Sequence, residues 1–127
     1  MPDLSLQICR FTLAFIWMYQ GIVPKWLGPH ADELAINMAT GATLEQAVQI
    51  SRVGGTLEVM FGVLVFVAWR KPWVFALSAL GIALLHAVVV VFQPALQLAA
   101  FNPVIINAAI MALSLIGHER ARAAQQR

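Results

Sequence analysis

Four stretches of the chain are almost continuously apolar, and the polar residues gather between them. The apolar stretches cover residues 4–23, 48–69, 73–92 and 103–117. About 20 apolar residues in a helix cross the hydrocarbon core of a bilayer, which is about 30 Å thick. The last stretch is short for this, so we expect tilt or local thinning of the bilayer. The pattern predicts an all-α fold, an integral membrane four-helix bundle that forms a single domain over residues 1–127.

The first connection, residues 28–49, is long and has the composition of a water-facing loop. Within it, residues 32–38 could form a short surface helix in this first outer loop, and Gly41 would end that helix. Thr43 and Gln46 have the spacing of a capping box. The second long helix should therefore begin near Thr43, with its first turns outside the hydrocarbon.

The other connections also carry residues that end or begin helices. Pro24 and Lys25 should end the first span, because proline lacks the N–H that a helix needs. Residues 95–101 are apolar but too few to cross a bilayer, so we expect an interfacial or re-entrant segment. Asn102 and Pro103 suit the N-cap and the first turn of the last helix.

The composition agrees with a protein that is dissolved in lipid. Hydrophobic residues make up 61% of the chain and charged residues 11%, whereas soluble domains have about a quarter charged residues. The net charge is +2, and most basic residues flank the apolar stretches, which argues against nucleic acid as a partner. Cys9 is the single cysteine, and the sequence contains neither clustered metal ligands nor a familiar catalytic motif. We expect no metal site, and whether any reaction is catalysed stays open.

The basic residues also predict the orientation of the bundle. Five lie on one side of the membrane, Arg70, Lys71, Arg120, Arg122 and Arg127, and two on the other, Lys25 and Arg52. Lysine and arginine are in excess in cytoplasmic loops. Both termini are therefore expected to be cytoplasmic.

Glu58 is a carboxylic acid inside the second apolar stretch. Gly54, Glu58 and Gly62 are spaced four apart, so they share one helix face, on which another helix could approach closely. A charge at bilayer depth costs about 2.5 to 3.5 kcal/mol on insertion scales. We therefore expect Glu58 to face the interior of the bundle and to have a partner, a proton or a ligand.

Depth estimates gather several polar residues in the outer half of the bundle. Glu58 should lie about 16 Å and His86 about 20 Å from the cytoplasmic ends of their helices. Asn107 and Gln20 fall within a turn or two of the outer ends of the last and first helices. Arg10 lies near the cytoplasmic end, where an arginine can snorkel. These depths predict a polar pocket from which Arg10 is absent.

Each polar residue also has a structural interpretation. Glu58 could pin the helix register, and His86 could be a satisfied core histidine rather than a proton relay to Glu58. Asn107 and Gln20 could serve as hydrogen-bond contacts between helices. Trp17 could be an interfacial ring or a ligand contact.

These residues, in this order, resemble the DoxX-like family of small membrane proteins. The matching segments of the first helix are residues 10–17, 19–21 and 24–25, and those of the second are Gly54, Gly55, Glu58 and Gly62. The start of the fourth helix matches at Gln93, Pro94, Phe101, Asn102, Pro103 and Asn107. The resemblance implies a four-helix protein of the inner membrane. It also implies candidate roles for the matching Arg10, Gly21, Lys25, Glu58, Pro94, Asn102 and Asn107.

Members of the wider DoxX group are associated with quinone-linked sulfur oxidation and with redox complexes. The resemblance therefore implies an accessory to a membrane redox process, with a quinone-like or other small lipid-soluble molecule bound near Glu58. The candidate ligand contacts are Glu58, His86, Asn107, Gln20 and Trp17, and the candidate anchors are Arg10, Lys25 and Asn102.

Two other functions remain open. The chain could be a small transporter or channel in which Glu58 and His86 line a path, or a structural or assembly subunit without a ligand. Alanines at positions 79, 83 and 87 form a smooth stripe that could serve either the bundle or a homo-oligomer. The expected partners are the lipid bilayer and, in the redox interpretation, a subunit of a redox complex or a small hydrophobic ligand.

Overall fold

The computed structural model describes residues 3–127, and these form helices joined by short connections. The elements are α1 (Leu4–Gly21), η1 (Ile22–Trp26), α2 (Ala31–Ala39), α3 (Leu44–Val67), α4 (Pro72–Phe92), η2 (Pro94–Leu98) and α5 (Pro103–Gln125). Four helices are long and apolar enough to cross a membrane: α1 with η1, α3, α4 and α5. The predicted fold class, a four-helix membrane bundle, is confirmed, and the short extra helix lies in the connection between the first two spans.

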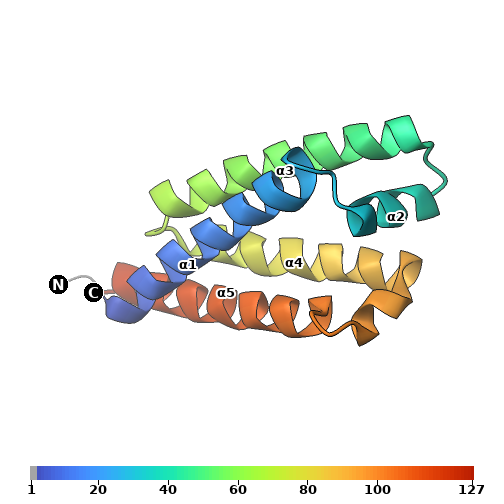
Figure 1. Ribbon diagram of the computed structural model, residues 1–127. Helices are drawn as coiled ribbons and strands as arrows, with labels where there is room; N and C mark the ends of the chain where they lie inside the picture. The colour runs from blue at the N-terminus through green and yellow to red at the C-terminus, as the bar shows by residue number, and fades with distance from the viewer. Residues whose placement is uncertain (1–2) are drawn as a thin grey trace.

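The start of α1 and the end of α5 lie at one end of the bundle, and the tight turn between α3 and α4 lies there too (Figure 1). We call this the terminal end, and we call the opposite end, with α2 and η2, the loop end. Helix α1 packs against both α3 and α5, and α4 packs along α5. Helices α3 and α4 follow each other in the chain, yet they contact each other only sparsely. They diverge towards the loop end, where α2 lies between them (Figure 1).

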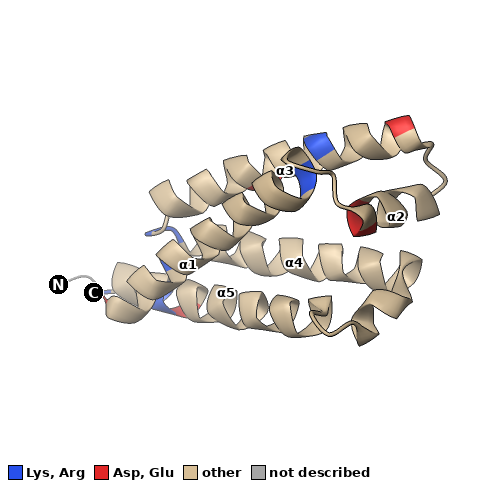
Figure 2. Ribbon diagram, viewed as in Figure 1, with Lys and Arg blue, Asp and Glu red and all other residues tan. Residues whose placement is uncertain are grey.

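The charged residues lie mostly near the two ends of the bundle and leave most of its middle uncharged (Figure 2). Lysines and arginines predominate at the terminal end, and acidic residues are concentrated at the loop end (Figure 2). This distribution suits a multi-pass membrane protein, because hydrocarbon excludes charge from the lipid-facing middle.

The predicted helix starts in the loops are confirmed. Thr43 and Gln46 form the complete capping box at the start of α3. Asn102 caps α5 by accepting a hydrogen bond of 3.1 Å from the N–H of Ile105. Helix α2 covers the predicted surface helix, and Gly41 follows it with φ +97°, a conformation that glycine adopts without steric cost.

Two helices run further than the apolar pattern indicates. Helix α5 continues to Gln125, because the residues beyond 117 are mostly good helix formers although they are polar. The first helix does not end at Pro24 but passes through Pro24 and Lys25 as the π-helical turn η1. This wider turn accommodates a residue that has no N–H to donate. It keeps Lys25 on the helix.

Close packing between α1 and α3 occurs at Gly55 and Gly62. A Cβ atom on Gly55 would lie 2.6 Å from the carbonyl oxygen of Gly21, and one on Gly62 would lie 2.9 Å from that of Ala14. The expectation that a helix approaches at Gly54 is wrong, since a Cβ there would have only the Cε of Lys25 as a near neighbour, at 3.9 Å. Gly55 and Gly62 are seven residues apart and so lie on one line of the helix, whereas Gly54 is turned away from that line.

Candidate functional site

A cavity of about 370 Å³ lies in the loop-end half of the bundle. Its lining residues come from α1, η1, α2, α3, α4, η2 and α5. On the four long helices, the lining residues lie within residues 16–25, 50–58, 82–89 and 103–110. The cavity therefore occupies the half of the bundle in which α3 and α4 have separated.

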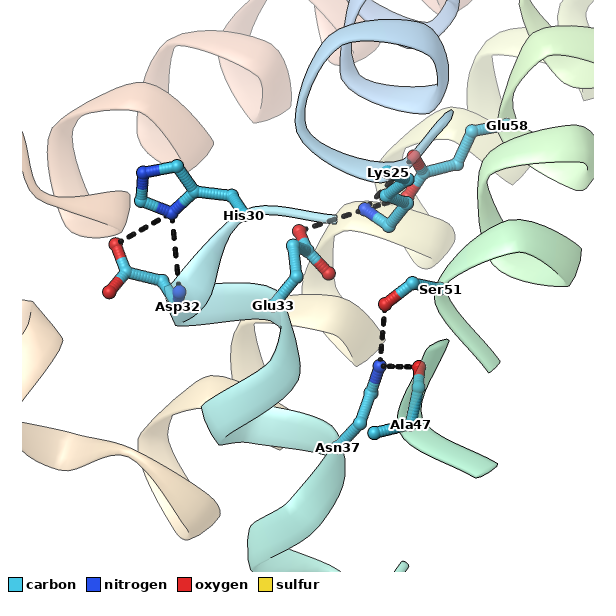
Figure 3. A network of polar contacts seen from close by, with 8 residues as sticks. All are labelled: Lys25, His30, Asp32, Glu33, Asn37, Ala47, Ser51 and Glu58. Atoms are coloured by element: carbon cyan, nitrogen blue, oxygen red, sulfur yellow. Dashed lines mark hydrogen bonds and ion pairs between the residues drawn. The ribbon is translucent and has the colours of Figure 1, made fainter. Parts of the chain in front are cut away.

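One lysine joins two carboxylates at the cavity wall (Figure 3). The Nζ atom of Lys25 lies 3.0 Å from Oε1 of Glu33 and 3.1 Å from each carboxylate oxygen of Glu58. Glu58 is 8% exposed, and the side chain of Lys25 is 13% exposed. The expected cost of an acid inside the bundle is thus reduced by an ion pair with a cation from another helix.

The two glycines on α3 make room for this lysine. A Cβ atom on Gly55 would lie 2.9 Å from the Cβ of Lys25, which is too close for an unstrained contact. The flexible stem of Lys25 then passes over Gly54, with its Cε 3.9 Å from the position of a Cβ there. The paired glycines and the π-helical turn together let the ammonium group reach Glu58, one turn further along α3.

Helix α2 is fastened over the cavity by polar contacts (Figure 3). Glu33 binds Lys25, and one turn later the amide nitrogen of Asn37 donates to Ser51 Oγ (2.9 Å) and to the carbonyl of Ala47 (3.2 Å). All of these contacts place the same face of α2 towards the bundle, because residues four apart share a helix face.

The floor of the cavity is a chain of buried hydrogen bonds. Trp17 donates from Nε1 to Ser78 Oγ at 2.9 Å, and the hydroxyl oxygens of Ser78 and Ser114 are 2.8 Å apart. Ser114 also donates to the carbonyl of Ile110 at 2.8 Å. The indole of Trp17 packs edge-on against Phe61, with ring centroids 5.1 Å apart. Three long helices, α1, α4 and α5, are therefore tied together at this level.

A sequence model of the DoxX-like family matches residues 14–115, which include every residue that lines the cavity. The chain belongs to the DoxX-like family. No curated protein and no protein of solved structure gave a significant match. Family membership and four apolar helices together identify a multi-pass membrane protein.

Five of the residues predicted for the site of this DoxX-like protein line the cavity: Trp17, Gln20, Lys25, Glu58 and Asn107. His86 lies behind this wall, with its Nδ1 atom 2.9 Å from Nδ2 of Asn107. Residues 3–127 contain no hydrogen bond between His86 and Glu58. Glu58 and His86 bind different partners, so there is no direct hydrogen bond through which a proton could pass between them.

The two remaining candidates lie away from the cavity. Arg10 is near the terminal end, where its Nε donates to the carbonyl of Phe66 at 2.9 Å and its guanidinium stacks 4.3 Å from the Phe66 ring centroid. Asn102 caps α5. Neither side chain is among those that line the cavity, and their suggested roles as anchors remain predictions.

Sequence reasoning missed four polar residues of the DoxX-like site, Asp32, Glu33, Asn37 and Ser51. For the last three the signal was present as helix spacing, since Glu33 and Asn37 lie one turn apart on α2, and Ser51 and Glu58 lie two turns apart on α3. No set of three His, Cys, Asp or Glu residues in the described chain is arranged to hold a metal ion.

Proposed function

We propose that this DoxX-like protein binds a small lipid-soluble molecule of the quinone type in the cavity beside Glu58, as an accessory to a membrane redox process. The cavity itself carries this proposal. Its volume of about 370 Å³ lies in the range of small-molecule sites, which combine apolar walls with a few polar groups. The redox setting is what the resemblance to the wider DoxX group implies, and membership of the DoxX-like family supports it.

The walls of the cavity differ in polarity from side to side. Helices α4 and α5 contribute mainly aliphatic side chains, among them Ile82, Leu85 and Ile106. The opposite side carries Glu58 and Lys25. A molecule with an oxygen-bearing ring and an apolar tail would match both sides. Its ring oxygens would face the polar wall, and its tail would face the aliphatic wall.

One edge of the cavity is exposed, which is consistent with access from the bilayer. Ile50 on α3 and Leu85 and Val88 on α4 line the cavity and are also partly exposed, by 47%, 42% and 39%. This edge is apolar and lies where α3 and α4 contact each other only sparsely. A lipid-soluble ligand could therefore pass between these helices without crossing water.

The shape of the cavity favours binding over conduction. A channel needs a path through the bundle, whereas the residues below the floor form a dry core that includes Leu13, Val65 and Phe75. The lining residues stop at the level of Trp17. A site closed on one side suits a ligand that is held rather than a solute that passes through.

The charge distribution supports an orientation with the terminal end in the cytoplasm, and the family resemblance supports the inner membrane as the location. The terminal end has the five basic residues of the orientation count against two at the loop end. In this orientation the cavity opens in the outer half of the bilayer.

Tryptophan fluorescence tests the proposal. In one variant, Trp26, Trp69 and Trp73 are replaced by phenylalanine, so that the tryptophan fluorescence comes from Trp17 at the cavity floor. In the control variant, Trp73 is the one tryptophan kept; it lies near the terminal end and is 49% exposed. Titration of decylubiquinone into nanodiscs should quench Trp17 saturably, while Trp73 should show only the linear quenching of a bilayer-dissolved quinone.

A cavity-filling substitution sharpens this test. Gly54→Leu places a side chain in the space beside Lys25 without meeting backbone, and it should weaken the saturable phase. Val63→Leu, at a position that is 48% exposed and outside the cavity, is the matched control. Equal quenching of Trp17 and Trp73, unaffected by Gly54→Leu, would rule out the cavity as a quinone site.

A further inference from the structure

Arg10 is a cation on a membrane-spanning helix, and aromatic rings surround its guanidinium group. The Cζ atom lies 4.3 Å from the ring centroid of Phe66, 5.0 Å from that of Trp69 and 5.1 Å from that of Phe11. Each of these rings attracts a cation. Phe11 and Phe66 are 54% and 39% exposed. Rings from α1, from α3 and from the turn after α3 therefore hold the guanidinium group at the outer surface of the bundle.

The hydrogen bonds of Arg10 use only part of its donors. An arginine side chain has five N–H groups. The Nε atom donates to the carbonyl of Phe66 at 2.9 Å, and Nη1 donates to Oε1 of Gln7 at 3.3 Å. The other three N–H groups have no acceptor within residues 3–127, and Arg10 forms no ion pair there. A charged side chain in a membrane span is expected to have a counter-charge or to reach the headgroups.

Two further cations lie beside this arginine. The Cζ atom of Arg70 is 5.0 Å from the ring of Trp69, so one indole contacts two guanidinium groups. Lys71 follows directly in the chain. Neither Arg70 nor Lys71 forms an ion pair within residues 3–127. Together with Arg10 they make a basic cluster with a formal charge of +3.

The acidic residues near this end of the bundle do not neutralise the basic cluster. Asp3 is paired with Arg120 at 3.4 Å, and Glu119 forms no ion pair in the described part of the chain. The depth of the cluster is given by Trp69 and Trp73, one on each side of the turn between α3 and α4. Tryptophan is enriched where the hydrocarbon meets the headgroups. The cluster therefore lies at the level at which phospholipids carry their phosphates.

We infer that the basic cluster binds the phosphate of an anionic phospholipid, with Arg10 as the central contact. A guanidinium group with free N–H groups can bind phosphate oxygens through two parallel hydrogen bonds. A zwitterionic headgroup brings its own ammonium group, which three unpaired cations would repel, whereas an anionic headgroup supplies the missing counter-charge. None of the three basic residues lines the cavity, so this lipid site is independent of the proposed quinone site.

Native mass spectrometry tests the inference. The detergent-solubilised protein is mixed with equal amounts of phosphatidylglycerol and phosphatidylcholine that have the same acyl chains. It should retain phosphatidylglycerol roughly tenfold more than phosphatidylcholine, because basic side chains favour a headgroup with a net negative charge. Equal retention of the two lipids would overturn the inference. Displacement of the lipid by a similar concentration of inorganic phosphate would show a site for free phosphate and would overturn the lipid assignment.

Three variants separate the basic cluster from the net charge of the protein. Arg10→Gln should lower the preference for phosphatidylglycerol by about fivefold. Arg52→Gln is the matched control, because Arg52 also lies over a tryptophan, with its Cζ atom 6.0 Å from the ring of Trp26, but at the loop end. It removes the same charge and should keep the preference. An equal loss in Arg52→Gln would mean that net charge selects the lipid, and would overturn the site.

Arg70→Gln changes an exposed side chain and should lower the preference in the same direction as Arg10→Gln. It therefore gives an answer even where Arg10→Gln is too unstable to purify. A preference that is unchanged in Arg70→Gln and in every folded Arg10 variant would overturn the inference.

Discussion

The two halves of this bundle are built from the same four helices but packed in opposite ways. In the terminal half the helices meet closely, and Leu13, Val65 and Phe75 have no exposed surface. In the loop-end half, the same helices enclose a cavity of about 370 Å³ and direct charged and amide side chains into it. The division lies at the level of the hydrogen bond between Trp17 and Ser78.

The comparison shows what separates a packed membrane core from a binding site. Association of helices in lipid depends on close packing and hydrogen bonds, because lipid tails are as apolar as the side chains. The terminal half has the close packing, for example where the ring of Phe75 fills the space beside Gly117. The loop-end half keeps one close helix contact, at Gly21 and Gly55, and otherwise relies on ion pairs and amide contacts. The first half can therefore stabilise the fold while the second stays hollow.

The largest expected effect is in the packed half. Phe75→Ala should lower the free energy of unfolding by about 3 to 5 kcal/mol, because the ring is fully buried and leaves a void. Ile106→Ala, at the edge of the existing cavity, should cost about 1 kcal/mol or less, since little packing is lost there. Thermal unfolding of both variants in the same detergent measures the difference. Similar losses in the two halves would contradict the division.

The next effect concerns the ion pairs. Lys25→Met should cost about 3 kcal/mol, because Glu58 would be left buried without its cation. The double variant Lys25→Met with Glu58→Met should recover most of that loss, since an apolar pair has no charge to compensate. Thermal unfolding again gives the result. A double variant as unstable as the single one would show that the lysine acts through packing and not through its charge.

Adjacent glycines provide a smaller and sharper test. Gly55→Ala should destabilise by about 1 to 3 kcal/mol, because the added methyl group meets the backbone of α1. Gly54→Ala should be neutral or stabilise by up to about 1 kcal/mol, because its Cβ enters open space and alanine favours a helix. The two variants differ by one position, so equal changes in unfolding temperature would refute the assigned packing.

The smallest effect belongs to the floor. Ser78→Ala should cost about 1 to 2 kcal/mol, because it leaves the indole N–H of Trp17 buried without its acceptor. The emission maximum of Trp17 in the single-tryptophan protein should also shift to shorter wavelength. Ser78→Thr keeps a hydroxyl group and is the control. An unchanged emission spectrum in Ser78→Ala would show that the hydrogen bond is not formed in the membrane.

Much of the fold could be predicted from the sequence, because its signals are local. Apolar length gives the spans, and the capping box at Thr43 and the Asn102 cap give two helix starts. The contacts of the site could not be predicted in the same way. Depth along straight helices put Glu58 near His86, but it does not say which helix faces lie together or that η1 carries Lys25 back over Gly54 and Gly55. Glu33 was missed because it belongs to a loop helix whose position depends on tertiary contacts.

The sparse contact between α3 and α4 has a mechanical consequence. Helices α1 and α3 form one closely packed pair and α4 and α5 another, and the two pairs touch mainly where α1 crosses α5. The two pairs are joined in the packed half and diverge towards the loop end. A segment of ten residues is about 15 Å long, so turning one pair by about 10° where the pairs are joined moves its far end by about 2.6 Å. A substitution where α1 crosses α5 would thus change the distance between the two helix pairs at the cavity, although it alters no residue that lines the cavity.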